Sequence, residues 1–169
     1  GCPTFVCHVQ HPSEVPDMLR ELGQAVQKSE EAEAWAVEIE TVLAETEPST
    51  QRVGLPLIWH DPLMAANGNT YAGNMLTCTG FDVPKIEPEG TGYPVVDAAA
   101  IVENGITDLF LSSEPHEFTS EEGEALLHVL REMTPTPPQV HHIDGEDLTW
   151  MGTRTLSGLK RLRAKWAES

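Results

Sequence analysis

The stretch ITDLFLSSEPHEF, residues 106–118, reads as a buried strand that runs directly into a polar and aromatic loop. Upstream, RVGLPLIWHDPLMAANGNTY (52–71) has the same plan of apolar strand, loop and helix start. Downstream, QVHHIDGEDLTWMGTR (139–154) repeats it. Three such units predict an open α/β sheet, and their loops should meet at the carboxyl ends of the strands, where such sheets bind ligands.

Composition limits the possible partners. The chain has 169 residues, 40% of them hydrophobic, which is enough for one domain with a real core. Asp and Glu number 27 against 10 Lys and Arg, for a formal charge of −17. An acidic protein of this kind is a poor match for nucleic acid or an anionic membrane, because both need basic surface.

The part before residue 52 predicts one strand and a long helical segment. PTFVCHV (3–9) is β-like, and Leu19, Leu22 and Val26 then keep helical spacing. A second apolar stripe includes Trp35 and Ile39, and the pattern stops at Pro48. The N-terminal strand has no sheet of its own in the sequence, so we expect it to lie outside the main sheet.

After residue 52 the pattern predicts alternating strands and helices. The expected elements are a strand at 53–59 with Pro56 in an edge or irregular position, a helix capped by Thr70, a helix at 95–105, a strand at 106–113, a helix capped by Thr119 or Ser120, a strand from about 139 and a closing helix from 153. The fold class expected is therefore a three-layer αβα lobe with a mostly parallel sheet, preceded by a long helix.

Motifs for catalysis or metal binding are weak. Ser112 and Ser113 precede His116, but no GxSxG is present, so a hydrolase is a minor alternative. Adjacent His141 and His142 diverge on a strand, and a site near His60, Asp61 and Asp144 is less favoured than ordinary polar loops. Cys2, Cys7 and Cys78 are expected to be buried free thiols. The prediction is no catalytic residue and no metal site.

Large apolar and aromatic side chains gather at the predicted loop tips. They are Trp59, Leu63, Met64, Tyr93, Phe118, Trp150 and Met151, interspersed with Asp61, Glu114, Asp147 and Arg154. Each alone is more often ordinary packing. Several at one sheet edge predict a binding surface for a large, flat, partly apolar ligand.

Three segments carry a family resemblance: WHDPLMAANGNTYAGNMLTCTGF (59–81), YPVVDAAAIVENGITDLFLSSEPHEF (93–118) and VHHIDGEDLTWMGTR (140–154). In order and spacing the chain resembles the periplasmic substrate-binding proteins of cobalamin, haem and iron-siderophore ABC importers. It is most similar to the cobalamin-binding-protein-like group, the helical backbone metal receptors. The resemblance covers residues 3–166.

The resemblance implies two α/β lobes joined by a long helix, with the ligand between them. Residues 1–12 would be the last strand of an N-terminal lobe, 13–48 the backbone helix and 49–169 the C-terminal ligand-binding lobe, with most of the first lobe lacking. It further implies a non-enzymatic, periplasmic protein that holds cobalamin, haem or a ferric siderophore without a covalent bond. The alternative is a standalone single-lobe interaction module that has lost transport.

Residue by residue, the resemblance assigns ligand contacts to Trp59, Leu63, Met64, Tyr93, Leu148, Trp150 and Met151. The family's permease-docking glutamate falls at Ala99, so Asp97 or Glu103 would have to substitute for it in contacting an ABC permease. Loss of the first lobe would also uncover the helix face that bears Trp35 and Ile39, which predicts self-association.

Overall fold

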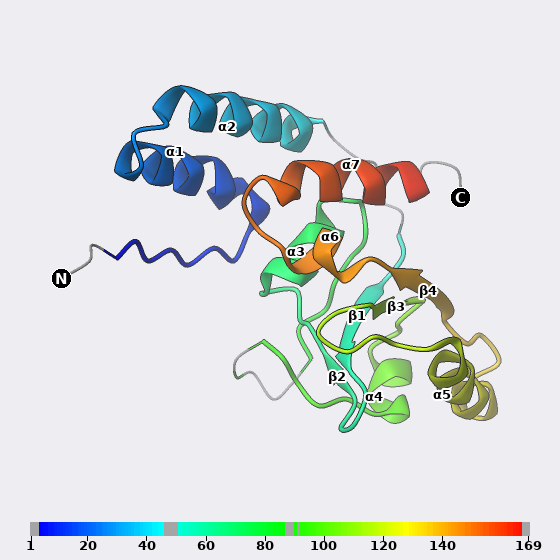
Figure 1. Ribbon diagram of the computed structural model, residues 1–169. Helices are drawn as coiled ribbons and strands as arrows, with labels where there is room; N and C mark the ends of the chain where they lie inside the picture. The colour runs from blue at the N-terminus through cyan, green and yellow to red at the C-terminus, as the bar shows by residue number, and fades with distance from the viewer. Residues whose placement is uncertain (1–3, 46–50, 87–89, 91, 167–169) are drawn as a thin grey trace.

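A four-stranded sheet forms the centre of the molecule (Figure 1). The computed structural model describes residues 4–45, 51–86, 90 and 92–166. The strands are β1 (Gly54–Trp59), β2 (Met64–Ala65), β3 (Asp108–Ser112) and β4 (Gln139–Ile143), in the spatial order β2-β1-β3-β4. β1, β3 and β4 run parallel, and β2 pairs antiparallel with β1. The predicted mostly parallel sheet is confirmed, although β1, with Pro56, is an inner strand and not an edge.

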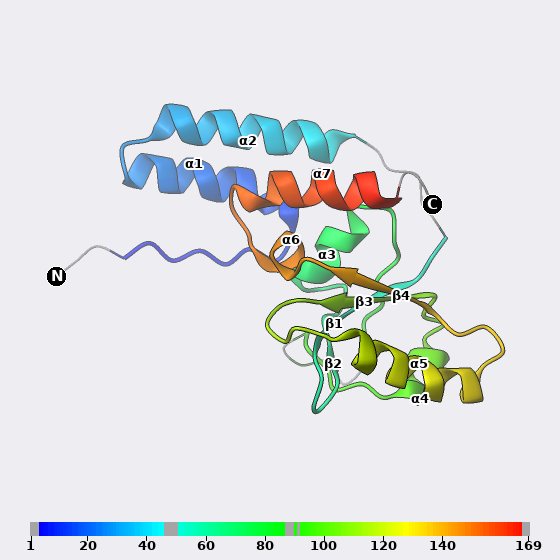
Figure 2. The ribbon, with the colours of Figure 1, turned by 45° about the vertical axis from the view of Figure 1, so that its right-hand side comes forward.

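Helices cover both faces of the sheet, as Figure 2 shows. The helices α4 (Ala98–Glu103) and α5 (Ser120–Met133) lie on one face, and α3 (Tyr71–Thr77), α6 (Gly145–Thr149) and α7 (Arg154–Trp166) on the other. Alternation along β3 supplies both cores, since Leu109 and Leu111 pack with one helix layer and Phe110 with the other. The three-layer αβα arrangement is confirmed.

The segment before the lobe is a helical hairpin, which corrects the prediction of one long helix. A short 3₁₀ turn, η1 (Pro12–Glu14), leads into α1 (Val15–Ala25), and α2 (Ser29–Ala44) returns alongside it (Figure 1). Gln27 adopts a φ of 58°, and the Lys28 amide donates to the carbonyl of Gly23 at 2.7 Å, which closes α1. A Cβ on Gly23 would lie 2.3 Å from the Cβ of Ala32, so glycine permits the close approach of the two helices.

The N-terminal segment is an extended arm and not a strand. Residues 4–10 form no strand, which corrects the prediction for the described part of PTFVCHV. A β-strand needs a hydrogen-bonded partner, and none lies beside the arm in the part of the chain that the structure describes. Phe5 and Val6 are exposed, while Val9 is buried at the junction with the lobe. The arm does lie outside the sheet, as expected (Figure 1).

Arg163 of α7 contributes hydrogen bonds to the attachment of the hairpin, beside the apolar core that the two share. Arg163 donates through Nη1 to the carbonyl of Val42 at 2.5 Å and through Nη2 to the carbonyl of Cys78 at 3.1 Å. Ile39 is completely buried, so the prediction that its helix face lacks cover is wrong, although Trp35 on the same helix is 42% exposed. The predicted self-association therefore loses the uncovered face on which it was based.

Candidate functional site

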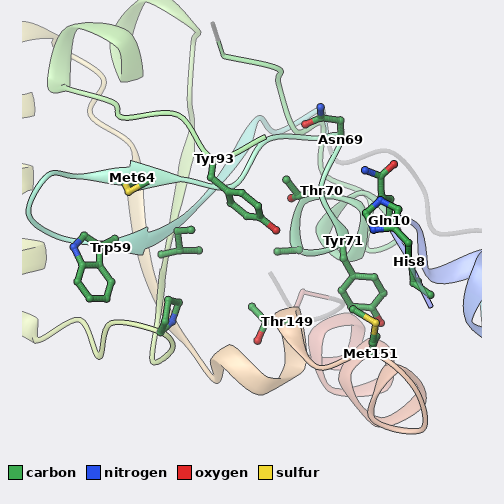
Figure 3. A pocket seen from close by; sticks show the side chains of 14 residues that line it. His8, Gln10, Trp59, Met64, Asn69, Thr70, Tyr71, Tyr93, Thr149 and Met151 are labelled. Carbon is green, nitrogen blue, oxygen red and sulfur yellow. The ribbon is translucent and has the colours of Figure 1, made fainter. Parts of the chain in front are cut away.

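A pocket of about 780 Å³ opens at the carboxyl ends of the parallel strands (Figure 3). Its lining comes from the ends of strands, the start of α3, two loops and the N-terminal arm. The lining residues are His8, Val9, Gln10, Ile58, Trp59, Met64, Asn69, Thr70, Tyr71, Ala72, Tyr93, Pro115, Thr149 and Met151. We call this the carboxyl-edge pocket. Four of the seven residues predicted to contact a ligand line it: Trp59, Met64, Tyr93 and Met151.

Backbone pairing brings Met64 and Tyr93 together. Met64 bridges to Val95, and the amide of Ala65 donates to the carbonyl of Pro94 at 3.0 Å. These contacts hold the Tyr93 loop along β2, and the Tyr93 ring reaches into the pocket (Figure 3). Tyr93 is 43% exposed, so much of its ring is available for contact with a bound molecule.

The start of α3 supplies a polar side to the pocket. Thr70 caps the helix, because its Oγ1 accepts from the amide of Gly73 at 3.1 Å. The hydroxyl of Tyr71 lies 2.6 Å from Oγ1 of Thr155, and burial raises the pKa of Tyr71 to about 12. Tyr71 is therefore a neutral, hydrogen-bonded phenol at physiological pH, which fixes this side of the pocket.

The arm completes the pocket, a contribution that the sequence did not predict. Nδ2 of Asn74 donates to the carbonyl of Gln10 at 2.9 Å, which anchors the arm against α3. His8 and Gln10 thereby reach the pocket lining (Figure 3). The contact joins residues 64 positions apart. No local pattern in the sequence signals such a contact. The Thr70 cap, by contrast, was visible in the sequence and already marked a helix start at this edge.

Three predicted ligand contacts lie elsewhere. Leu148 is completely buried, because the short helix α6, which was not predicted, turns it into the core. Leu63 borders a smaller cavity with Phe118. Trp150 donates from Nε1 to Oε2 of Glu114 at 2.9 Å and borders a groove beside Trp35. In the geometry of the described residues, Leu63, Leu148 and Trp150 do not line the carboxyl-edge pocket.

The neighbouring polar groups are held in hydrogen bonds. His116 Nε2 lies 3.1 Å from Oε1 of Glu122, and the Ser112 hydroxyl donates to the carbonyl of Glu114 at 2.6 Å. The backbone amide of Thr119 and the bond to His116 lower the pKa of Glu122. Within the described residues, no group of three or more His, Cys, Asp or Glu is placed to hold a metal ion.

The two acids proposed for permease contact lie on α4. Asp97 is exposed and caps the helix, since its Oδ1 accepts from the amide of Ala100 at 2.8 Å. Glu103 is exposed at the last position of the same helix. Both carboxylates are thus on an outer surface of the lobe. None of the described helices is long and apolar enough to cross a membrane.

The thiols differ from the prediction in one respect. Cys7 and Cys78 are both free, as expected. Cys7, however, is exposed on the arm next to His8 because the predicted strand does not form, whereas Cys78 is half-buried. Burial raises the pKa of the Cys78 thiol. Cys2 lies outside the described residues.

No protein-family model matches the sequence, and no curated relative matches it either. Solved structures do share its fold. The periplasmic vitamin B12 binding protein BtuF of Vibrio cholerae is similar with a TM-score of 0.66, at 14% identity, over 96% of this chain and 64% of its own. The periplasmic haem-binding protein HutB of Vibrio cholerae gives a TM-score of 0.71, at 15% identity, over 91% and 63%.

A third similar structure is described as an ABC-type Fe³⁺-hydroxamate transport system from Saccharomonospora viridis. Its TM-score is 0.67, at 14% identity, over 98% of this chain and 59% of its own. The chain therefore spans less than two thirds of the length of these structures. The predicted resemblance is confirmed at the level of the fold, which is that of periplasmic binding proteins for haem, vitamin B12 and iron chelates.

Proposed function

We propose that this chain is a ligand-binding part of an ABC importer for a metal chelate, with cobalamin as the first candidate and haem or a ferric siderophore as the others. Its role would be capture and delivery outside the cytoplasm, without catalysis. The observation that supports this most is the carboxyl-edge pocket itself. Aromatic and thioether side chains from strand ends and loops line about 780 Å³ at the edge where α/β sheets bind ligands.

The carboxyl-edge pocket is large enough to hold part of a large ligand against one side of the lobe. Pockets for small molecules usually measure about 300–1,000 Å³ and bury most of the ligand. Trp59, Tyr93 and Met64 offer flat or polarisable surface to a chelate ring. The similar structures are longer than this chain, so we propose that this lobe covers one side of the ligand. In an importer, Asp97 or Glu103 on α4 would then contact the permease.

Calorimetric titration of the chain with cyanocobalamin, ferric haem and ferrichrome tests the proposal. At least one of these should bind, and Tyr93→Ala should weaken that binding about tenfold, as expected for loss of one aromatic contact worth about 1–2 kcal/mol. Trp35→Ala is a matched control, because Trp35 is exposed to a similar degree but lies on α2.

The affinities of the variants decide whether the ligand lies at the carboxyl-edge pocket. Loss of affinity in Tyr93→Ala with an unchanged Trp35→Ala supports a ligand at the carboxyl-edge pocket. Equal affinities for the wild type and Tyr93→Ala would contradict this location. Trp150→Ala separates the pocket from the neighbouring groove, since Trp150 is held by Glu114 outside the pocket lining. Absence of binding to all three chelates would contradict the proposed function.

A further inference from the structure

The side chains that line the carboxyl-edge pocket are apolar groups, amides, hydroxyls and one imidazole, in a chain with a formal charge of −17. No Asp, Glu, Lys or Arg is among the described residues that form the lining. Its hydrogen-bonding groups are amides, hydroxyls and one imidazole, from residues such as Gln10, Asn69, Thr149 and His8. Such groups pair well with neutral polar groups on a ligand, but they do not balance several like charges.

The Lys and Arg side chains lie outside the lining of the carboxyl-edge pocket. All ten Lys and Arg lie in the described part of the chain, and none lines the pocket. Arg20 pairs with Glu33 and Glu40 on the hairpin, and Arg52 pairs with Asp108 at the opposite edge of the sheet.

Arg154 is the nearest cation to Met151 along the chain, and it is surrounded by acids. It lies within 3.3 Å of carboxylate oxygens of Asp144, Glu146 and Asp147. Three carboxylates against one guanidinium leave the local charge negative, although Arg161 also pairs with Asp147. Arg154 is therefore poorly placed to attract an anionic ligand to the pocket.

We infer that the pocket selects neutral or positively charged metal chelates and discriminates against those with several negative charges. This rests on the chelate-binding function proposed above and specifies the class of ligand. A multiply charged anion would have to leave water for a neutral surface inside a negative field. A neutral chelate meets neither penalty, and a cationic one is drawn toward the protein by its net charge.

Ligands that differ in charge provide the test. Cyanocobalamin and ferrichrome are neutral, and ferrioxamine B has one positive charge. Ferric haem with its two propionates and ferric enterobactin with three negative charges are the anions. By calorimetry at physiological salt, the tightest ligand should be neutral or cationic, and ferric enterobactin should bind at least about tenfold more weakly.

A pair of methionine variants separates the pocket from the charge of the whole protein. Met151→Lys places a cation at the pocket, and Met133→Lys places one at the far end of α5; the two methionines are 42% and 46% exposed. Both variants change the net charge equally. Met151→Lys should raise the affinity for ferric enterobactin about tenfold, and Met133→Lys less than about twofold, because salt screens the distant charge.

The outcomes distinguish this inference from the function on which it rests. If haem or ferric enterobactin is the tightest ligand of the wild type, the charge selectivity is wrong while chelate binding stands. Equal effects of Met151→Lys and Met133→Lys, or no effect of Met151→Lys, would also overturn it, because the pocket lining would not set the selectivity. If none of the five chelates binds, the proposed function fails and the charge selectivity fails with it.

Discussion

Aromatic residues lie at both ends of the parallel strands, the amino edge and the carboxyl edge, but the charged side chains beside them differ. At the amino edge, Asp108 has a side chain only 1% exposed and accepts from Arg52 Nε at 2.9 Å. His141 Nε2 lies 2.6 Å from the same carboxylate, and the His141 ring packs against the rings of Phe110 and Trp166. At the carboxyl edge, no Asp, Glu, Lys or Arg is among the described residues that line the pocket.

This difference separates a structural site from a candidate binding site. At the amino edge the buried carboxylate has fixed partners, and aromatic rings pack around the group. At the carboxyl edge the aromatic rings of Trp59 and Tyr93 are more than 40% exposed, so their surface is open to a ligand. A perturbed carboxylate alone would have indicated the amino edge as the candidate site, although structural ion pairs also shift pKa values.

The largest expected effect is on the amino edge. Asp108→Asn removes the buried carboxylate that accepts hydrogen bonds from Arg52 and contacts His141, so the free energy of unfolding should fall by about 3–5 kcal/mol. Urea unfolding followed by circular dichroism measures this. Glu31→Gln, which breaks the exposed pair with Lys28, is the control and should change the stability little. A comparable loss in both variants would show that burial of Asp108 is not what matters.

Lowering the pH should remove the stabilisation that the Asp108 carboxylate provides. Burial raises the pKa of Asp108, but hydrogen bonds from His141, Arg52 and Thr107 outweigh it and lower the pKa from 3.8 to about 2. Because the folded-state pKa is depressed, the stabilisation is complete above about pH 4 and is lost as the pH falls through 2. The contribution is roughly 2 kcal/mol. The difference in unfolding free energy between the wild type and Asp108→Asn should therefore be smaller at pH 2.5 than at pH 5. An equal difference at the two pH values would contradict the assignment.

Arg52→Lys is a milder change at this edge. Arg52 reaches both oxygens of Asp108 and also lies 5.1 Å from the centroid of the Phe81 ring. Lysine keeps the charge but loses the two-point contact and the planar stacking, so we expect a loss of about 1 kcal/mol in unfolding free energy. If thermal unfolding shows no difference from the wild type, the charge alone suffices and the geometry is unimportant.

The smallest stability effect should come from the carboxyl edge. Tyr93→Ala removes a ring that is 43% exposed, and substitutions at such positions usually change stability by less than about 0.5 kcal/mol. The same variant should lose chelate affinity, so stability and binding would respond at opposite edges. A large loss of stability in Tyr93→Ala would show that the ring serves the core and not a ligand.

Local sequence patterns predicted most of the lobe. The apolar run before Ser112 forms β3, and Thr119 with Glu122 forms the capping box that starts α5. The helical hairpin of α1 and α2 was harder to predict. The turn at Gln27 falls between two apolar stripes that together read as one, and the packing of Gly23 on Ala32 appears only in three dimensions.

The sequence predicted only those parts of the pocket that lie close to the strand ends. Trp59 and Met64 lie at the ends of β1 and β2, and Tyr93 lies near the bridge at Val95, so the rule that loops meet at the carboxyl edge located them. Leu148 lies outside the pocket lining because α6, with its cap at Asp144, places that side chain in the core. His8 and Gln10 were missed because their position depends on the contact of the arm with Asn74, which is far away in the sequence.

The exposed thiol beside His8 makes the protein convertible into an optical sensor. Cys7 lies one residue from the pocket lining, while the raised pKa of the half-buried Cys78 slows its reaction with maleimides. With Cys2 replaced by Ser, an environment-sensitive dye would attach preferentially at Cys7. Its emission would then respond to any molecule that enters the pocket, so that whole libraries of chelates could be screened by fluorescence.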